Sequence, residues 1–273
     1  LMVAAFRARP DHGAFSGHAR ALNGADNVLT RMQDTWYETS FSVNKAAESV
    51  LGGVTCVSGP LAGFRREAIY NFLPAWAEDR FLGAPFPFAT DRQLTGYVLG
   101  GKEKGAALRR RHADSPFVTE ATYEDRRWKV GYVKAARVKT AVPDTVRRMA
   151  KQQIRWKKSF LRNLAFTGTF YWRRGPAASF LFYGHALFVV LAPVMAFRHL
   201  VLAPVAGEWA LAPLYLAGVT FKGAVWAVAF RVENPGDARW FYRPLMSLTA
   251  SVAFSWMLLY SALTLRRGVW SRG

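Results

Sequence analysis

The chain has 273 residues, enough for one large domain or for one medium domain with an appendage. Its formal net charge of +19 favours anionic partners: phosphates, nucleotide sugars, nucleic acids or an anionic membrane leaflet. Cys56 is the only cysteine, so an internal disulfide framework and a multi-cysteine zinc site are both excluded.

The first residues, LMVAAFRARP, lack the charged and apolar regions of a signal peptide. Leu1 is not an initiator methionine. We therefore expect the chain to begin partway through a longer protein.

Residues 1–170 have the pattern of a soluble, mixed α/β region. VAAF and HGAFSGHARAL suggest short strands, and GGVTCVSGP suggests a buried strand that ends in a tight turn. Residues 25–51 contain no Gly or Pro and are apolar at helical spacing, which predicts one helix or two. REAIYNFLPAWAEDRFL is expected to be helical, with a break near Pro74.

The next stretch, residues 100–130, is polar and weakly periodic, which favours an exposed loop or an insertion. GYVKAARVKTAV then alternates as a strand does. VPDT is expected to open a helix, with Pro143 in the first turn and Asp144 near its positive end. That helix carries the basic run KQQIRWKKSF.

Three apolar segments of about 20 residues or more follow, at 177–197, 209–230 and 240–265. Each has the length of a membrane span, and flanking Trp, Tyr and Arg suit interfacial anchoring. Buried helices of a globular core are the alternative. If the basic helix is cytosolic, three full spans place RRGVWSRG outside, against the positive-inside tendency. Either 240–265 is re-entrant or interfacial, or one of the other spans is wrong.

In the basic run, Gln152, Arg155 and Trp156 are three and four residues apart, so they share one helix face. Arg is suited to phosphate oxygens, and Trp offers a flat surface for a sugar ring. From residue 134 to residue 174 there are twelve Lys and Arg and one acidic residue. An amphipathic helix on a membrane surface therefore stays an alternative, with Lys151, Lys157 and Lys158 meeting lipid phosphates.

Two other stretches hold candidate site residues. Ser58, Gly59 and Pro60 form a turn after an apolar strand, where α/β proteins place ligand groups. Asp91 and Arg92 adjoin an apolar segment, and the carboxylate there has the chemistry of a general base. An ordinary turn and a surface ion pair are the respective alternatives.

The order CVSGPLAGFRR, ATDRQLT and QQIRW, followed by apolar segments, resembles the processive family 2 glycosyltransferases, in particular the hyaluronan synthase, chitin synthase and NodC-like group. HGAFSGHARALN is similar to the strand that follows that family's metal-binding D-x-D, and TLRRGVWSRG is a loose match to its W-G-T-R ending. The resemblance implies the C-terminal part of a cytosolic, Rossmann-like GT-A domain in residues 1–170 and an α-helical transmembrane region in 171–273.

By this resemblance, Asp91 is the catalytic base that deprotonates the acceptor hydroxyl, and Arg155 neutralises the leaving diphosphate. Gln152 would position the acceptor and Trp156 would stack on its terminal sugar. The resemblance also implies an acceptor- and donor-binding group that contains these residues together with Ser58, Gly59, Pro60, Arg92 and Gln153.

The implied reaction is inverting transfer from a UDP-sugar to a growing β-linked polysaccharide, with translocation of the polymer. The implied partners are the UDP-sugar, the polysaccharide and membrane lipids, with no nucleic acid. The implied location is the plasma membrane, with several spans and a cytosolic catalytic part.

Two departures from the family pattern stand out. The family's G-D-D is Ala89-Thr90-Asp91 here, and the chain contains no D-x-D. The Mg²⁺ or Mn²⁺ expected for the full-length enzyme therefore has no ligands in this chain, and we expect the D-x-D upstream of Leu1. We expect residues 1–273 alone to be inactive and to bind donor weakly.

Two other functions compete with this one. A catalytically degenerate or truncated relative that acts as a membrane scaffold is the first, and the missing acid and D-x-D favour it. A membrane-anchored nucleic-acid binder is the second, and it would leave the three ordered motifs as coincidences.

Overall fold

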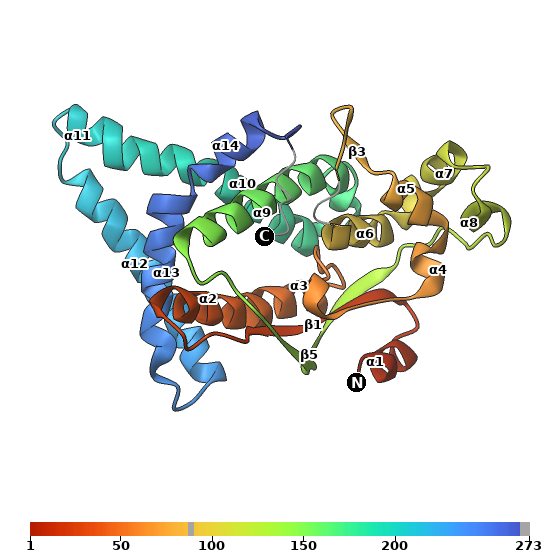
Figure 1. The fold of residues 1–273 in the computed structure, drawn as a ribbon, viewed down its shortest axis with the longest axis horizontal. Coiled ribbons are helices and arrows are strands. Elements are labelled where there is room, and N and C mark those ends of the chain that lie inside the picture. The colour runs from red at the N-terminus through yellow and green to blue at the C-terminus, as the bar shows by residue number, and fades with distance from the viewer. Residues whose placement is uncertain (87–89, 268–273) are drawn as a thin grey trace.

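Figure 1 shows the protein as a computed structural model, which describes residues 1–86 and 90–267. Residues 1–174 form an α/β layer, and the long apolar helices of residues 176–263 pack against it. Ala89 and the C-terminal GVWSRG, which belong to two of the compared motifs, lie outside the described residues.

The α/β layer contains five strands and nine α-helices among the described residues. The strands are β1 (His12–Ala21), β2 (Ala62–Phe64), β3 (Arg80–Phe81), β4 (Ala84–Pro85) and β5 (Lys129–Thr140). The helices are α1 (Met2–Ala8), α2 (Val28–Thr39), α3 (Ala46–Val50), α4 (Arg66–Ile69), α5 (Leu73–Ala77), α6 (Thr90–Leu99), α7 (Gly101–Arg111), α8 (Pro116–Thr119) and α9 (Val146–Thr167).

The main sheet has the order β2-β1-β5, with β2 antiparallel and β5 parallel to the central strand. Because β1 is covered on both faces, its residues are nearly all buried, and Ala14 and Phe15 have no exposed surface. The strands expected in HGAFSGHARAL and GYVKAARVKTAV are confirmed. The parallel pairing brings together chain segments separated by all of α2 to α8.

Three of our sequence expectations were wrong. VAAF lies in α1, not in a strand, and this helix packs Phe6 edge-to-face on Phe15, with ring centroids 4.9 Å apart. GGVTCVSGP forms no strand: it joins the sheet through a bridge from Gly53 to Val130, and its last two residues lie in a 3₁₀ turn. Residues 100–130 contain α7 and α8 instead of a loop, because α7 buries Leu108 in a cluster with Phe72, Tyr97 and others.

The helical expectations were closer. Residues 25–51 form α2 and α3, joined by a π-helical turn, η1 (Ser40–Lys45). The helical segment REAIYNFLPAWAEDRFL is broken near Pro74, as expected: a 3₁₀ turn at residues 70–72 separates α4 from α5, and Pro74 lies in the first turn of α5. Helix α9 begins after the cap residue Thr145, so Pro143 precedes the helix and is not in its first turn. Short 3₁₀ turns complete the layer: η2 (Gly59–Leu61), η3 (Tyr70–Phe72) and η4 (Tyr171–Arg174).

The apolar region has two helices that are long and apolar enough to cross a membrane, or up to three if one bent pair is a single span. The first runs from Pro176 to Val205 and the second from Leu211 to Glu233; the pair Ala238–Phe254 and Met257–Leu263 is bent by 42°. Their elements are α10 (Pro176–Phe197), η5 (Arg198–Leu202), α11 (Ala203–Val205), α12 (Leu211–Glu233), η6 (Ala238–Phe241), α13 (Tyr242–Thr249), η7 (Ala250–Phe254) and α14 (Met257–Leu263).

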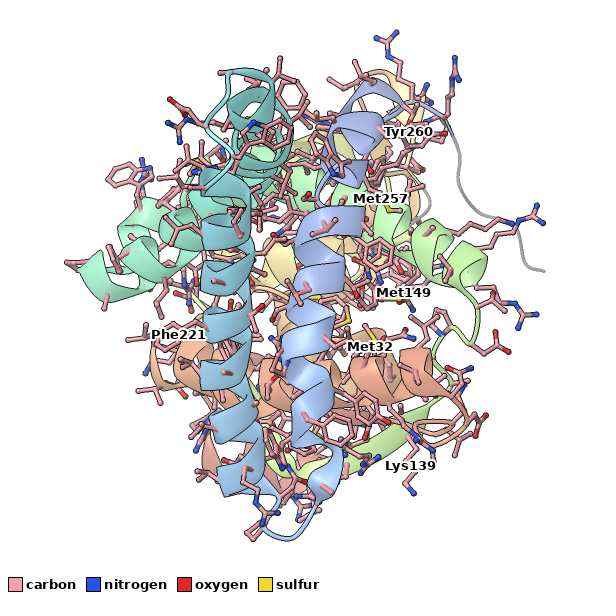
Figure 2. The ribbon with its side chains drawn as sticks, turned by 90° about the vertical axis from the view of Figure 1, so that its left-hand side faces the viewer. Met32, Lys139, Met149, Phe221, Met257 and Tyr260 are labelled. Carbon is pink, nitrogen blue, oxygen red and sulfur yellow. The ribbon has the colours of Figure 1, made fainter. Side chains whose placement is uncertain are left out.

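Figure 2 shows α12 and α13 side by side across α2. A methionine-rich cluster joins α13 and η7 to α2 and α9, and its buried members are Met32, Met149, Met246 and Phe254. On the outer side of α12, large apolar side chains such as Phe221 point away from the protein (Figure 2), and Phe221 is 72% exposed. The apolar helices therefore use one side for the α/β layer and leave another side uncovered.

Candidate active site

The Ser-Gly-Pro turn and Asp91 meet in the structure. The backbone N–H of Gly59 donates to Asp91 Oδ2 at 3.0 Å, and Arg92 N–H donates to Asp91 Oδ1 at 2.8 Å. Asp91 is half-buried in the first turn of α6, while Gly59 and Pro60 are exposed. The carboxylate is thus held in a fixed orientation beside an open stretch of backbone.

The segment before the turn is joined to α6 through the side chain of Thr95. Thr95 Oγ1 donates to Asp91 O at 2.7 Å and accepts from Val57 N–H at 2.9 Å. On the other side, Ser58 N–H donates to the fully buried Ser16 of β1 at 3.3 Å. These bonds position the Ser58–Pro60 turn relative to both the sheet and α6.

Arg92 lies behind Asp91 in a cluster of half-buried groups that also contains Lys45, Glu48 and Cys56. Burial works to lower the pKa of Arg92, but the nearby Cys56, Asp91 and Glu48 outweigh it and raise that pKa. Burial raises the pKa of the Cys56 thiol, whose sulfur is 3.9 Å from Asp91 Oδ2. Arg92 therefore stays a cation at the base of the site.

The second group of predicted residues lies on α9. The Trp156 ring packs against Trp36 and Tyr37 of α2, with centroid distances of 5.7 Å and 6.1 Å. The Gln152 side chain and the charge of Arg155 both act on the pKa of the Tyr37 phenol. The structure therefore brings Gln152, Arg155 and Trp156 together, as their spacing predicts.

Tyr37 is a member of this face that the sequence did not single out. Burial raises the pKa of Tyr37 to about 12, although Gln152 and Arg155 act in the opposite direction. The phenol is thus neutral at physiological pH. The Oε1 atom of Gln152 is buried and has no hydrogen-bond partner among the described residues.

The structure does not bring every predicted residue into one contact set. Asp91, Gly59 and Arg92 form one group, and the α9 residues form another with α2. Gln153 is buried, 6% exposed, and its Nε2 has no hydrogen-bond partner within the described part of the chain. Its predicted role in binding stays a prediction.

The known proteins to which the chain is similar include hyaluronan synthases and an N-acetylglucosaminyltransferase. Hyaluronan synthase of Streptococcus pyogenes is 34% identical over 149 residues, 55% of this chain and 29% of its own length. An N-acetylglucosaminyltransferase of Rhizobium meliloti is 29% identical over 205 residues, 74% of this chain and 42% of its own length. Hyaluronan synthase 1 of Xenopus tropicalis is 27% identical over 172 residues, which are 63% of this chain and 25% of its own length.

The chain is a relative of the family 2 glycosyltransferases. It spans less than half the length of each of these relatives. No family model matches the chain. A small mixed sheet followed by two or three apolar helices is consistent with part of a glycosyltransferase domain and its membrane helices.

One basic residue of this glycosyltransferase relative is not where we expected it. Lys158 is 1% exposed and donates to the carbonyl oxygens of Thr264 and Arg267, the latter at 2.8 Å. It therefore joins α9 to the end of α14 and cannot meet a lipid phosphate. Lys151 is exposed, whereas burial lowers the pKa of the half-buried Lys157.

Family 2 glycosyltransferases usually use a divalent metal. Residues 1–86 and 90–267 contain no group of three or more His, Cys, Asp or Glu side chains that could hold a metal ion. The described residues of this relative therefore do not fit such an ion.

Proposed function

We propose that the chain is the acceptor-side and membrane part of an inverting glycosyltransferase. It would transfer sugar from a UDP-sugar to a growing β-linked polysaccharide of the hyaluronan or chitin kind and move the polymer through its apolar helices. The observation that carries the proposal is the Gly59–Asp91 hydrogen bond, which holds a carboxylate beside an exposed turn. The relatives named hyaluronan synthase and N-acetylglucosaminyltransferase support the class of reaction.

In the proposed reaction, Asp91 accepts the proton of the acceptor hydroxyl. The acceptor oxygen forms a bond to the anomeric carbon of the donor sugar, and the bond from that carbon to the diphosphate oxygen breaks. UDP leaves with the electron pair, and the configuration at the anomeric carbon inverts. The backbone N–H groups of Gly59 and Arg92 donate to the Asp91 carboxylate and fix its orientation, so the carboxylate does not have to reorient during the reaction.

The α9 face would supply the remaining functions. Arg155 would stabilise the negative charge that develops on the diphosphate. The Trp156 ring packs against Trp36 and Tyr37, and it would offer an aromatic surface for the terminal sugar of the acceptor. Gln152 Oε1 would accept a hydrogen bond from a sugar hydroxyl, which satisfies its buried oxygen.

The alternative is a degenerate relative that acts as a membrane scaffold. Thr90 in place of the family acid and the missing metal ligands favour it. The two proposals are separated by radiolabelled sugar incorporation in membranes that carry the natural gene product containing residues 1–273, with each UDP-sugar added alone and then in pairs. Polymer formation would exclude the scaffold, and no incorporation with any donor pair would exclude the enzyme.

We further propose that the α/β layer faces the cytosol at the plasma membrane. Residues 1–273 by themselves should bind UDP-sugars only weakly, because they lack a metal-holding group among the described residues. Calorimetric titration of the isolated chain with a UDP-sugar and Mn²⁺ tests this, and tight binding would contradict it.

A further inference from the structure

Asp34 of α2 is a buried carboxylate, 1% exposed, that none of the proposed reaction steps uses. Arg20 of β1 donates to both of its oxygens, at 2.9 Å and 2.6 Å, and the backbone N–H of Ala21 donates to Oδ1 at 3.0 Å. A fourth hydrogen bond, from Arg239 of η6, reaches Oδ2 at 2.9 Å. The carboxylate therefore joins the central strand of the sheet, α2 and the start of the bent pair.

The two arginines of this network also fix the neighbouring chain segments. Arg20 donates to Glu38, one turn further along α2, at 2.6 Å and to Asn234, just after α12, at 3.2 Å. Arg239 donates to both oxygens of Asp237, at 3.1 Å and 2.6 Å. Because a guanidinium has a rigid, planar set of donors, such pairs set orientation as well as distance. The network thus fixes how η6 approaches α2.

The contact between α2 and the bent pair continues along α13. Arg243 of α13 is 7% exposed and donates to Thr39 of α2 at 3.1 Å. Near the start of α2, Arg31 donates to the hydroxyl of Tyr242 at 3.1 Å. Met32 belongs to the methionine-rich cluster that also contains residues of α13 and α9 (Figure 2). One side of α2 is therefore covered by the bent pair.

Another side of α2 carries the aromatic rings against which Trp156 of α9 packs. These rings belong to Trp36 and Tyr37, which follow Asp34 by two and three residues. With a helical rise of 1.5 Å per residue, they lie within about 5 Å of Asp34 along the helix axis. A shift of α2 at Asp34 would therefore move both rings relative to Trp156.

We propose that Asp34 and Arg239 are positioning residues of the candidate active site. Their ion pair lets the bent pair hold α2, and the two aromatic rings of α2, against Trp156. This inference rests on the proposed function, and it deepens that function because it gives the apolar helices control over how the acceptor is bound. Arg155, the proposed diphosphate contact, lies on α9 itself, which hydrogen bonds from Lys158 and Arg162 connect to other segments. Loss of the ion pair should therefore affect the acceptor and spare the donor.

The test uses variants of Arg239 in the natural gene product. Arg239 is partly exposed, and Asp34 keeps its pair with Arg20 when Arg239 is changed. Arg239→Gln should raise the KM for a short acceptor about fivefold and leave the KM for the UDP-sugar unchanged. Arg239→Lys, which retains a cation beside Asp34, should keep the acceptor KM within about twofold of the parent value.

Lys134→Gln is the matched control. Lys134 of β5 pairs with Glu233 of α12, so this ion pair also joins an apolar helix to the α/β layer, but through β5 instead of α2. Both KM values should stay unchanged. Asp237→Asn is a second and milder variant, because the amide still caps η6 but holds the guanidinium of Arg239 less firmly. It should raise the acceptor KM by a smaller factor than Arg239→Gln.

A second measurement needs no sugar transfer. Fluorine NMR of the protein labelled with 5-fluorotryptophan reports the surroundings of Trp156, whose resonance is the one that Trp156→Phe removes. Arg239→Gln should shift this resonance, and Asp237→Asn should shift it in the same direction. Arg239→Lys and Lys134→Gln should leave it in place.

An unchanged acceptor KM in Arg239→Gln would overturn the proposal. An equal rise in both KM values would overturn it as well, since the ion pair would then act on the fold as a whole. So would a Trp156 resonance that stays in place in both Arg239→Gln and Asp237→Asn. A Trp156 resonance that moves in a protein that transfers no sugar supports the positioning role and contradicts only the proposed reaction.

Discussion

The backbone N–H of Gly59 donates to Asp91 Oδ2 at 3.0 Å across 32 positions of the chain. This contact joins two motifs whose order alone would leave them unconnected. The orientation of the carboxylate thus depends on the turn as well as on α6. Both partners can be varied separately.

Asp91→Asn should remove sugar transfer without removing the fold. The amide oxygen of Asn still accepts from Gly59 N–H, but it cannot take a proton from the acceptor. A general base contributes roughly 10²–10⁴-fold to a rate, so we expect a loss of that size in initial incorporation rate. Asp114→Asn, at an exposed aspartate, is the control. A rate within twofold of the parent protein would remove Asp91 from its role.

Gly59→Ala should reduce transfer while leaving stability unchanged or slightly higher. A Cβ at this position would meet only Asp91 Oδ2, at an ordinary distance of 3.6 Å. Alanine also stabilises by about 0.4–1 kcal/mol where the backbone accepts it. The methyl group would cover the carboxylate oxygen that the acceptor must reach. Parallel measurements of thermal unfolding and initial rate check this, and a fully active variant would show that the acceptor approaches the other oxygen.

Tyr37→Phe should weaken use of the acceptor and leave use of the donor unchanged. It removes the phenol oxygen on which the Gln152 side chain acts, and a polar interaction of this kind is worth about 1 kcal/mol, or about fivefold in kcat/KM for a short acceptor. Tyr70→Phe is the matched control, because Tyr70 bonds to Glu120 away from α9. An equal change in the KM for UDP-sugar would show that Tyr37 acts on the fold instead.

Some of this arrangement could be predicted from the sequence, and the reasons differ between elements. β5, KVGYVKAARVKT, contains Val, Tyr and Thr, which are residues of high strand propensity, so its pattern indicates a strand. β1, HGAFSGHARA, has only Phe15 of this kind, so its composition is a weaker signal. Helix α7, GKEKGAALRRR, buries one large apolar residue, Leu108, so it has no apolar stripe to detect. The segment that follows α7 is held to it by the ion pairs Arg109–Asp125 and Arg127–Glu103, and spacing alone does not reveal such pairs.

For the candidate site, the residues that share α9 could be predicted from the sequence, but their partners on other elements could not. Spacing on one helix placed Gln152, Arg155 and Trp156 on a common face, because helical geometry is local. Tyr37 completes that face from α2, and only tertiary packing brings the two helices together. The adjacent aromatic pair in DTWYET was the available signal. Lys158 was wrongly expected at a lipid surface, because its buried carbonyl partners belong to a segment far along the chain.

Acid should destabilise the α/β layer through Glu38. Burial works to raise the pKa of Glu38, but the hydrogen bond from His18 and the charge of Arg20 outweigh it and lower the pKa to about 2 from 4.5. A depressed folded-state pKa contributes stability above the unfolded value, here about 3 kcal/mol, that is lost as pH falls from about 4.5 towards 2.

Glu38→Gln tests this acid dependence. Unfolding by denaturant in detergent, followed by circular dichroism at several pH values, should show the variant less stable at pH 7. The two proteins should converge only as the pH falls to about 2. A constant difference at all pH values would mean that the charge of Glu38 is not the cause.

The ends of the apolar helices predict on which side of the membrane each connection lies. Arg174, just before α10, donates to the carbonyls of Leu99, Gly52 and Trp128, and Asn234, just after α12, accepts from Arg20. These two ends therefore adjoin the α/β layer, and the 206–210 connection lies on the far side. The bent pair begins with Arg239 bonded to Asp34. It ends beside Lys158 of α9, so both its ends adjoin the same layer, and we predict that it does not cross the membrane.

Cysteine labelling tests this topology in a Cys56→Ser background. Glu208→Cys, in the far connection, should react with a membrane-impermeant maleimide in intact cells. Arg266→Cys should react only after the membrane is opened, and so should Lys102→Cys in α7, which serves as the internal control. A re-entrant pair places the C-terminal arginines with the α/β layer, which agrees with the positive-inside tendency. Labelling of Arg266→Cys in intact cells, with Lys102→Cys protected, would mean that residues 238–263 cross the membrane.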